Sequence, residues 1–83
     1  MGGVSSMSKI SHLESFAELP PSAQLVYRAL ETDSPLSLQS ICEQTGLVES
    51  TARYALGHLS AAEVLVSRPD PVDARQRLYE IDS

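Results

Sequence analysis

The chain has 83 residues and a formal net charge of −5, from eleven acidic residues against six lysines and arginines. This length fits one small domain that buries roughly 60% of its unfolded surface, and no apolar run approaches the ~20 residues that would cross a bilayer. No basic stretch leads into an apolar segment of signal-peptide type either, so we expect a cytoplasmic protein. One cysteine excludes an internal disulfide, and Cys42, His12 and His58 are not at zinc-site spacing, so we expect no metal or cofactor.

The N-terminal third should contain two helices separated by a proline break. Residues 1–9 combine glycine and serine with no apolar periodicity, so we expect a flexible leader, followed by a single domain over residues 10–83. Residues 10–19 have the spacing of a short amphipathic helix. Pro20 and Pro21 then break the chain, and the next helix should run from about Ser22 to Thr32. Its expected buried face comprises Ala23, Val26, Ala29 and Leu30, with Leu25 alongside.

Residues 37–59 have the layout of two amphipathic helices joined by a tight turn. Leu36 should form one short strand, and Ser37 should cap the first helix. Gly46 can take the left-handed conformation that ends that helix, while Cys42 is small enough for the second helix to approach. The pattern predicts a helix-turn-helix unit. Its apolar seam should comprise Ile41, Leu47, Ala52, Ala55, Leu56 and Leu59.

The second helix, expected over residues 49–63, divides into two faces. Its apolar residues recur at helical spacing, and a displaced stripe at the same spacing carries Ser50, Arg53, Tyr54 and Gly57. In a helix-turn-helix unit this stripe is the candidate face for contacting DNA bases, which we call the reading face. The alternative is an ordinary helical hairpin whose polar stripe meets only water.

The segment after this helix has the pattern of an antiparallel hairpin. Residues 64–68 favour a strand, residues 69–73 have turn chemistry, and residues 75–81 alternate as a returning strand. Arg75 and Arg77 are two apart and should project to one side, with Gln76 on the other. The element order predicts an α+β, mainly α fold, the winged helix-turn-helix, with a three-helix core and a β-hairpin wing.

Three stretches carry a resemblance to a known family: LPPSAQLVYRAL, SPLSLQSICEQTGLVESTARYALGHL and DARQRLYEI. Together they resemble small archaeal, haloarchaeal-type winged-helix transcriptional regulators of the MarR-like families, over most of residues 19–81. The resemblance implies DNA binding. The residues it assigns to the groove-facing helix are Ser50, Thr51, Arg53, Tyr54 and Gly57, and those it assigns to the wing are Arg75 and Arg77.

The chain also departs from that family. MarR-like sensors usually add long terminal helices that form the dimer and enclose a small-molecule pocket, whereas this chain ends two residues after Ile81. We therefore expect no small-molecule ligand, and any homodimer should form through residues 10–30. Gly57 inside the reading helix costs about 1 kcal/mol relative to alanine, which hints at close backbone approach to DNA or to another helix.

Charge is distributed unevenly along the sequence. Residues 50–77 hold four arginines against three acids, a net charge of +1, whereas the rest of the chain carries −6 from two cations and eight acids. Four phosphate contacts would give a log–log salt slope near −3.6. One lysine against five arginines and eleven acids is also typical of proteins from salt-loving archaea, although a mildly acidic domain from any prokaryote would look similar.

Each candidate residue also has a structural interpretation. Arg53 could bind guanine or a phosphate, or it could pair with Glu49 one turn earlier. Tyr54 could contact DNA or cover the helix crossing, and Ser50 and Thr51 could bind a phosphate or cap the helix. Glu49 itself either accepts from cytosine N4 or stabilises the helix N-terminus.

The wing arginines carry the same ambiguity. Arg75 and Arg77 could reach phosphates or the minor groove, or one of them could neutralise Asp70 or Asp73 across the turn. The leading hypothesis remains a sequence-specific, DNA-binding transcriptional regulator. The alternative is a winged-helix module for protein–protein interaction within a larger assembly. No phosphate loop or nucleophile–base pair indicates an enzyme.

Overall fold

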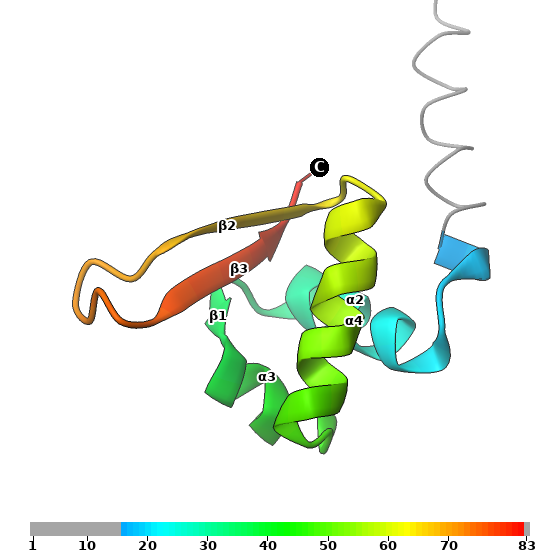
Figure 1. The fold of residues 1–83 in the computed structure, drawn as a ribbon, viewed down its shortest axis with the longest axis horizontal. Helices are drawn as coiled ribbons and strands as arrows, with labels where there is room; N and C mark the ends of the chain where they lie inside the picture. Colours follow the sequence, from blue (N-terminus) through cyan, green and yellow to red (C-terminus); the bar gives the residue numbers. More distant parts are fainter. Residues whose placement is uncertain (1–15, 83) are drawn as a thin grey trace, which may run out of the picture.

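The computed structural model describes residues 16–82, and its elements follow the predicted order of helix, short strand, helix, helix, strand, strand (Figure 1). The helices are α2 (Pro21–Thr32), α3 (Leu38–Thr45) and α4 (Glu49–Ala61), and the strands are β1 (Leu36–Ser37), β2 (Leu65–Pro69) and β3 (Arg77–Ile81). The expected leader and residues 10–15 of the first expected helix lie outside the described residues. That residues 10–83 form one domain stays a prediction. No helix within residues 16–82 is long and apolar enough to span a bilayer.

Local signals in the sequence set the ends of α2 and α3. Pro21 opens α2 one residue earlier than expected, because proline at the first helical position loses no needed hydrogen bond. The Ser37 hydroxyl accepts a hydrogen bond from the Ser40 N–H at 3.2 Å and so caps α3, as predicted. Gly46 ends α3 at φ 78°, and its N–H donates to the Cys42 carbonyl at 2.8 Å, which confirms the predicted left-handed turn.

The three helices and the sheet enclose one apolar core. Among these helices, α2 and α4 make the most extensive contact, and α3 packs against both. Two predictions for the buried face of α2 are wrong: Ala29 is only half-buried, and Leu25 is 42% exposed because it lies roughly 100° around the helix from Val26. The predicted seam and Cys42 lie in the core or against it. The buried residues are Ala23, Val26, Leu30, Leu36, Ile41, Ala52, Ala55, Leu56, Leu59 and Val64.

Helix α4 is two residues shorter than predicted, because the chain turns left-handed after it. Ala62 is the C-cap, and Glu63 adopts φ 63°. The Glu63 N–H donates to the Ser60 carbonyl and the Val64 N–H to the Leu59 carbonyl, at 3.0 and 3.2 Å. This turn directs the chain from the helix axis into β2.

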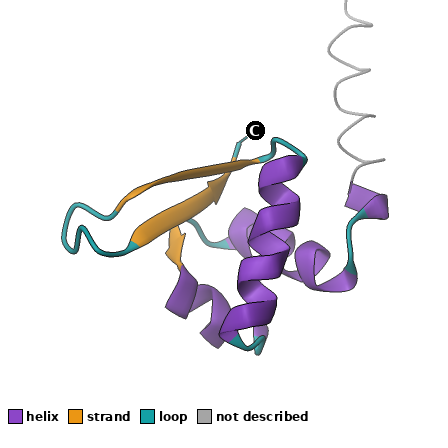
Figure 2. Ribbon diagram, viewed as in Figure 1, coloured by secondary structure: helices purple, strands orange, loops and turns teal. Residues whose placement is uncertain are grey.

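The wing is part of a three-stranded antiparallel sheet in the order β1-β3-β2 (Figure 2). β1 pairs with the middle of β3, where Leu36 is opposite Tyr79 and Ser37 is opposite Leu78, and this pairing fixes the hairpin to the helical core. β2 pairs with β3 from Leu65 opposite Ile81 to Pro69 opposite Arg77. The expectation that the returning strand starts at residue 75 is wrong, because the pairing ends at the Pro69–Arg77 position and the loop beyond it closes on itself.

Candidate nucleic-acid interface

The outer face of α4 is polar and open to solvent, as its spacing predicts. Ala52, Ala55, Leu56 and Leu59 are buried, and the displaced stripe of Ser50, Arg53, Tyr54 and Gly57 is exposed. Thr51 is half-buried between the two faces. The helix therefore presents one continuous polar surface while its other side is held by the core.

Arg53 is engaged with Glu49 one helical turn earlier. Its Nε donates a hydrogen bond to Glu49 Oε2 at 3.1 Å, and Nη2 lies 3.0 Å from the same oxygen in an ion pair. The two side chains are 64% and 66% exposed, so the pair contributes only a few tenths of a kcal/mol to folding. The predicted ion pair is confirmed, but its weakness leaves the guanidinium available to an incoming ligand.

The wing tip is ordered by two aspartates. The Val72 N–H donates to Asp70 Oδ1 at 2.8 Å, and the Arg75 N–H donates to Asp73 Oδ1 at 3.1 Å. Backbone bonds from Asp70 to Gln76 and from Gln76 to Asp73 close the loop at 3.0 and 2.9 Å. Arg75 therefore sits in the loop and not on β3, so the prediction that it alternates with Gln76 along a strand is wrong.

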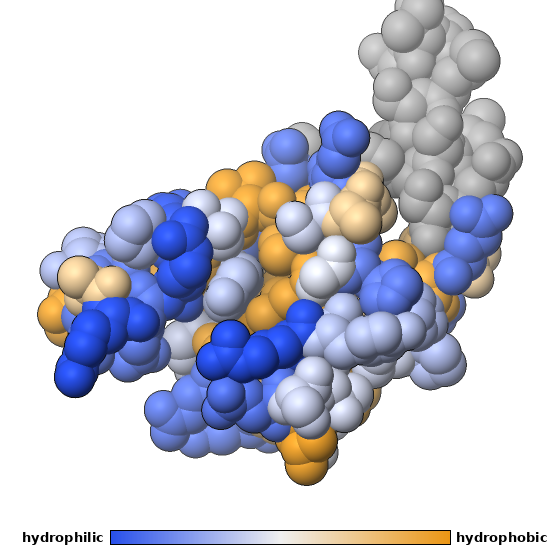
Figure 3. All heavy atoms as spheres, in the orientation of Figure 1, coloured by the Kyte–Doolittle hydropathy of each residue, from blue (hydrophilic) through white to orange (hydrophobic). Residues whose placement is uncertain are grey.

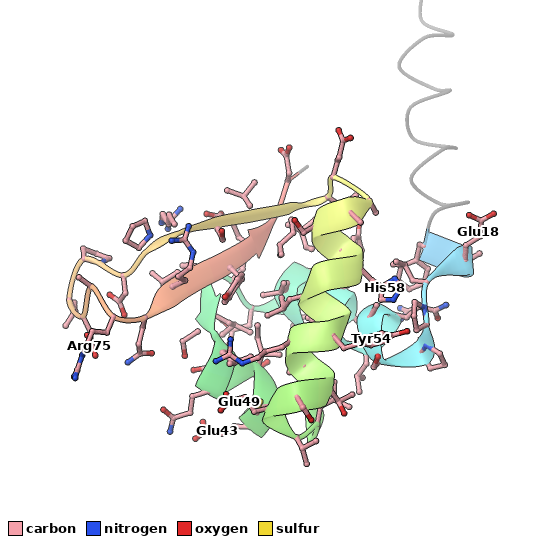
Figure 4. All side chains as sticks on the ribbon, in the orientation of Figure 1. Glu18, Glu43, Glu49, Tyr54, His58 and Arg75 are labelled. Carbon is pink, nitrogen blue, oxygen red and sulfur yellow. The ribbon has the colours of Figure 1, made fainter. Side chains whose placement is uncertain are left out.

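Arg75 lies at the tip of this loop (Figure 4). Its side chain is 92% exposed, and its Nε donates to Asp73 Oδ1 at 3.4 Å. The alternative that one wing arginine neutralises an aspartate of the turn is thus confirmed for Arg75 and Asp73. An exposed pair of this kind is easily exchanged for another anion.

The pKa of Asp73 should depend on the hydrogen bonds that this carboxylate accepts in the wing loop. Hydrogen bonds from the Arg75 backbone, and then from the Gln76 side chain, hold the pKa of Asp73 below its ordinary value of 3.8. A lowered pKa in the folded state stabilises the loop above the unfolded value, and the effect is lost as pH falls through the lowered pKa. We expect the Arg75 amide shift, followed by NMR, to titrate with a midpoint below 3.8. The Asp73→Asn variant should abolish that titration, and a midpoint at or above 3.8 would contradict this description of the loop.

The second wing arginine lies on the side of the sheet that faces α3 and α4. Arg77 donates from Nη2 to Ser67 Oγ at 3.1 Å, and it shares its strand face with Tyr79, which packs against the core. Arg68 is on the opposite face and pairs with Glu80 there. Of the four arginines of residues 50–77, three therefore remain candidates for a shared surface.

Those three arginines surround one open depression between the wing and the start of α4, which we call the arginine hollow. Figure 3 shows hydrophilic residues gathered over the wing and over the N-terminal part of α4. The hollow is lined by Leu38, Gln39, Glu49, Arg53, Arg75, Gln76, Arg77 and Tyr79. The structure thus brings Arg53 together with Arg75 and Arg77, although they belong to separate segments of the chain.

The other predicted contacts do not join the hollow. Tyr54 is 56% exposed and lies edge-on to His58, with ring centroids 4.5 Å apart, on the side of α4 that faces away from the wing (Figure 4). Capping does not explain Ser50 and Thr51, because Val48 occupies the N-cap of α4. A Cβ added at Gly57 would meet nothing within 4 Å, so no helix of the described residues approaches it.

Two glutamines of the hollow were not predicted as site residues. Gln39 lies in the first turn of α3, and Gln76 was expected on the opposite side of the strand from the arginines. Gln76 Nε2 instead donates to Asp73 Oδ2 at 3.3 Å. The Asp–x–x–Gln spacing could have indicated this turn. Gln39 carries no local signal, because its place in the hollow depends on how the wing folds back.

Comparisons by sequence gave no match to a protein-family model or to a curated protein. Comparisons of structure gave several solved proteins. The PcaV transcriptional regulator of Streptomyces coelicolor, solved with its natural ligand, is 22% identical with a TM-score of 0.73, over 96% of this chain and 60% of that one. BpsR of Bordetella bronchiseptica is 22% identical with a TM-score of 0.69, over 95% and 67%. MepR of S. aureus, solved with DNA, is 13% identical with a TM-score of 0.72, over 94% and 66%.

These neighbours are MarR-family winged-helix transcriptional regulators, and the likeness shows that this chain has their fold. The chain spans about 60% of the length of PcaV. The comparisons give no support to the archaeal part of the resemblance. DNA binding by BpsR is regulated by 6-hydroxynicotinic acid, so these neighbours do not support the expectation of no small-molecule ligand either.

Proposed function

We propose that this protein is a sequence-specific, DNA-binding transcriptional regulator that inserts α4 in a major groove while the wing grips the flanking backbone. The observation that carries the proposal is the arginine hollow, which Arg53 lines from α4 and Arg75 and Arg77 line from the wing. Two flexible exposed pairs and one hydroxyl contact hold these groups, so phosphates and base edges can replace their present partners. The regulatory role of the structural neighbours supports the same function.

The net charge of −5 does not oppose this proposal, because the acids are not evenly placed. Nucleic-acid affinity comes from cations that displace counterions from phosphates, and these must lie on one surface. Three arginines at the hollow would give a log–log salt slope of about −2.7 per chain if each neutralised one phosphate, and about −1.8 if Arg53 contacted a base instead. Even a slope of −2.7 is shallower than the −3.6 expected from four phosphate contacts, because Arg68 lies on the other face of the sheet with Glu80.

The proposal is tested by selection from a random-sequence duplex pool at controlled salt, followed by gel shift with the enriched duplex. A regulator of this kind should enrich a defined site and bind it with the salt dependence given above. Binding that never exceeds binding to the starting pool would overturn sequence specificity. No binding at low salt would overturn the DNA function altogether.

A substitution at Gly57 would distinguish an effect on the stability of α4 from an effect on DNA binding. The site where a Cβ would stand is open, and the residue is exposed in mid-helix. Replacing Gly57 with alanine should therefore raise the free energy of unfolding by roughly 0.5–1 kcal/mol, measured by urea denaturation. If the helix backbone lies against DNA, the same variant should bind the enriched duplex more weakly. A variant that is more stable and binds equally well would remove Gly57 from the interface.

A homodimer through residues 10–30 remains part of the proposal, although residues 10–15 lie outside the described part of the chain. Support comes from the exposed side of α2, where Leu25 is 42% exposed. Arg28 lies over the Phe16 ring, 5.2 Å from its centroid, and that ring is edge-on to Tyr27. Such amphipathic aromatic and arginine groups are frequent at protein interfaces. Sedimentation equilibrium would show whether two chains associate.

Protein docking is the second candidate function. It is favoured by Val48, which is 66% exposed at the start of α4 and lies beside the exposed helix face. Exposed apolar groups on a recognition surface often mark a protein partner. The duplex selection distinguishes the two functions, because a docking module would not enrich a DNA sequence.

A further inference from the structure

The closest charge to the Arg53 guanidinium among the described residues is a carboxylate on the same helix face. Glu49 Oε2 accepts a hydrogen bond from Arg53 Nε and lies within ion-pair distance of Nη2, and both side chains line the arginine hollow. A carboxylate at the centre of a surface meant for phosphates would repel them unless it has a task there. The geometry of the pair indicates that task.

Arginine has five N–H donors arranged on a planar fork. Glu49 occupies the edge formed by Nε and one side of Nη2. The end of the fork, formed by Nη1 and the other side of Nη2, has no hydrogen-bond partner among residues 16–82. That end carries two parallel N–H donors that can bind guanine O6 and N7 together. The pair therefore presents Arg53 with its base-reading end available.

The charge of Glu49 should also select between two kinds of acceptor. A phosphate that approached Arg53 would come close to the Glu49 carboxylate and be repelled, whereas guanine O6 and N7 are neutral acceptors. Arg77 differs, because its hydrogen-bond partner among the described residues is the neutral hydroxyl of Ser67. A phosphate can bind Arg77 without displacing or facing a paired carboxylate.

We infer that Glu49 is a specificity-determining positioning residue, which directs Arg53 to a base edge and prevents it from acting as a phosphate contact. The inference rests on the proposed DNA-binding function and adds a division of labour to it. Arg77 binds the backbone, and Arg53, held by Glu49, reads sequence. Stabilisation of the helix N-terminus by Glu49 is the simpler role, and it would change the melting temperature without changing salt dependence or base discrimination.

The test is the Glu49→Gln variant, assayed with the duplex enriched by the unsubstituted chain and with a random-sequence duplex pool. Loss of the carboxylate should release Arg53 to phosphates. We expect affinity for the random pool to rise about threefold, from one removed repulsion at roughly 6 Å in water. The log–log salt slope should become steeper by about 0.9, and the ratio of specific to random affinity should fall at least threefold.

The matched control is Glu43→Gln. Glu43 is an exposed acid of α3 that accepts a hydrogen bond from Gln39 at 3.5 Å, and no arginine of the described part of the chain pairs with it. This variant makes the same change in net charge as Glu49→Gln but releases no arginine. The salt slope and the affinity ratio should therefore match those of the unsubstituted chain. Far-UV circular dichroism should show that both variants keep the fold.

Three results would overturn the inference. An unchanged slope and ratio in Glu49→Gln would leave Glu49 with only a structural role. Equal changes in Glu43→Gln would show a general effect of net charge. No DNA binding by the unsubstituted chain would remove the proposed function, and the inference with it.

Discussion

Replacing Arg53 with alanine should weaken binding to the enriched duplex by about 1–3 kcal/mol, or roughly 5- to 150-fold, and relax the preference at one base pair. The loss should be this large because the end of its guanidinium is free to make a bidentate contact with a base. Stability should hardly change, since the pair with Glu49 is more than 60% exposed on both sides. Gel shift and urea denaturation measure the two effects separately.

Arg68→Ala is the matched control for that experiment. Arg68 is also an exposed, ion-paired arginine, but it pairs with Glu80 on the face of the sheet away from the hollow. Its removal should leave affinity for the enriched duplex nearly unchanged. Equal losses for the two variants would mean that binding depends on total positive charge and not on the position of Arg53.

Replacing Leu59 with alanine should lower the free energy of unfolding by about 2–5 kcal/mol. Leu59 is fully buried where α4 meets the core, and the truncated side chain would leave a cavity between packed helices. A domain of this size has on the order of 5–10 kcal/mol of stability, so the variant should lose a large part of it. The midpoint of urea denaturation reports the loss.

Leu25→Ala is the control for the core experiment. Leu25 is on α2 but 42% exposed, so the same truncation should cost less than about 1 kcal/mol. Similar losses at Leu25 and Leu59 would contradict the described packing, because they would place both side chains in equivalent surroundings.

The elements of the fold could be predicted because their signals are local. Ser37 caps the helix that follows it, and Gly46 turns left-handed where a glycine is needed. The buried face of α4 follows from spacing alone, as Ala52 and Leu59 show. These residues specify their structure within one or two helical turns, which a single sequence can reveal.

The sequence-based predictions of the wing strand and of the end of α4 failed where local interactions compete with regular secondary structure. Asp73 draws the backbone of residues 73–76 into a turn, so strand alternation fails at Arg75. Glu63 takes a left-handed conformation that is uncommon for a residue with a Cβ, and this shortens α4. Neither effect is visible in hydrophobic periodicity.

The composition of the hollow could be predicted only in part. Arg53 and Arg77 were expected on one surface, and the fold brings them together, but Tyr54 points elsewhere because its angular position on α4 carries it away from the wing. Gln39 joins the hollow only through the long-range pairing of β1 with β3, which positions the wing over α3. Contacts of this kind depend on tertiary structure.

The central claim is that α4 and the wing engage one duplex together through the arginine hollow. Amide chemical-shift mapping during titration with the enriched duplex tests it most directly. The predicted result is a set of shifts concentrated in residues 49–57 and 73–77, with little change along the exposed side of α2. Shifts confined to α2, or to only one of the two arginine segments, would contradict it.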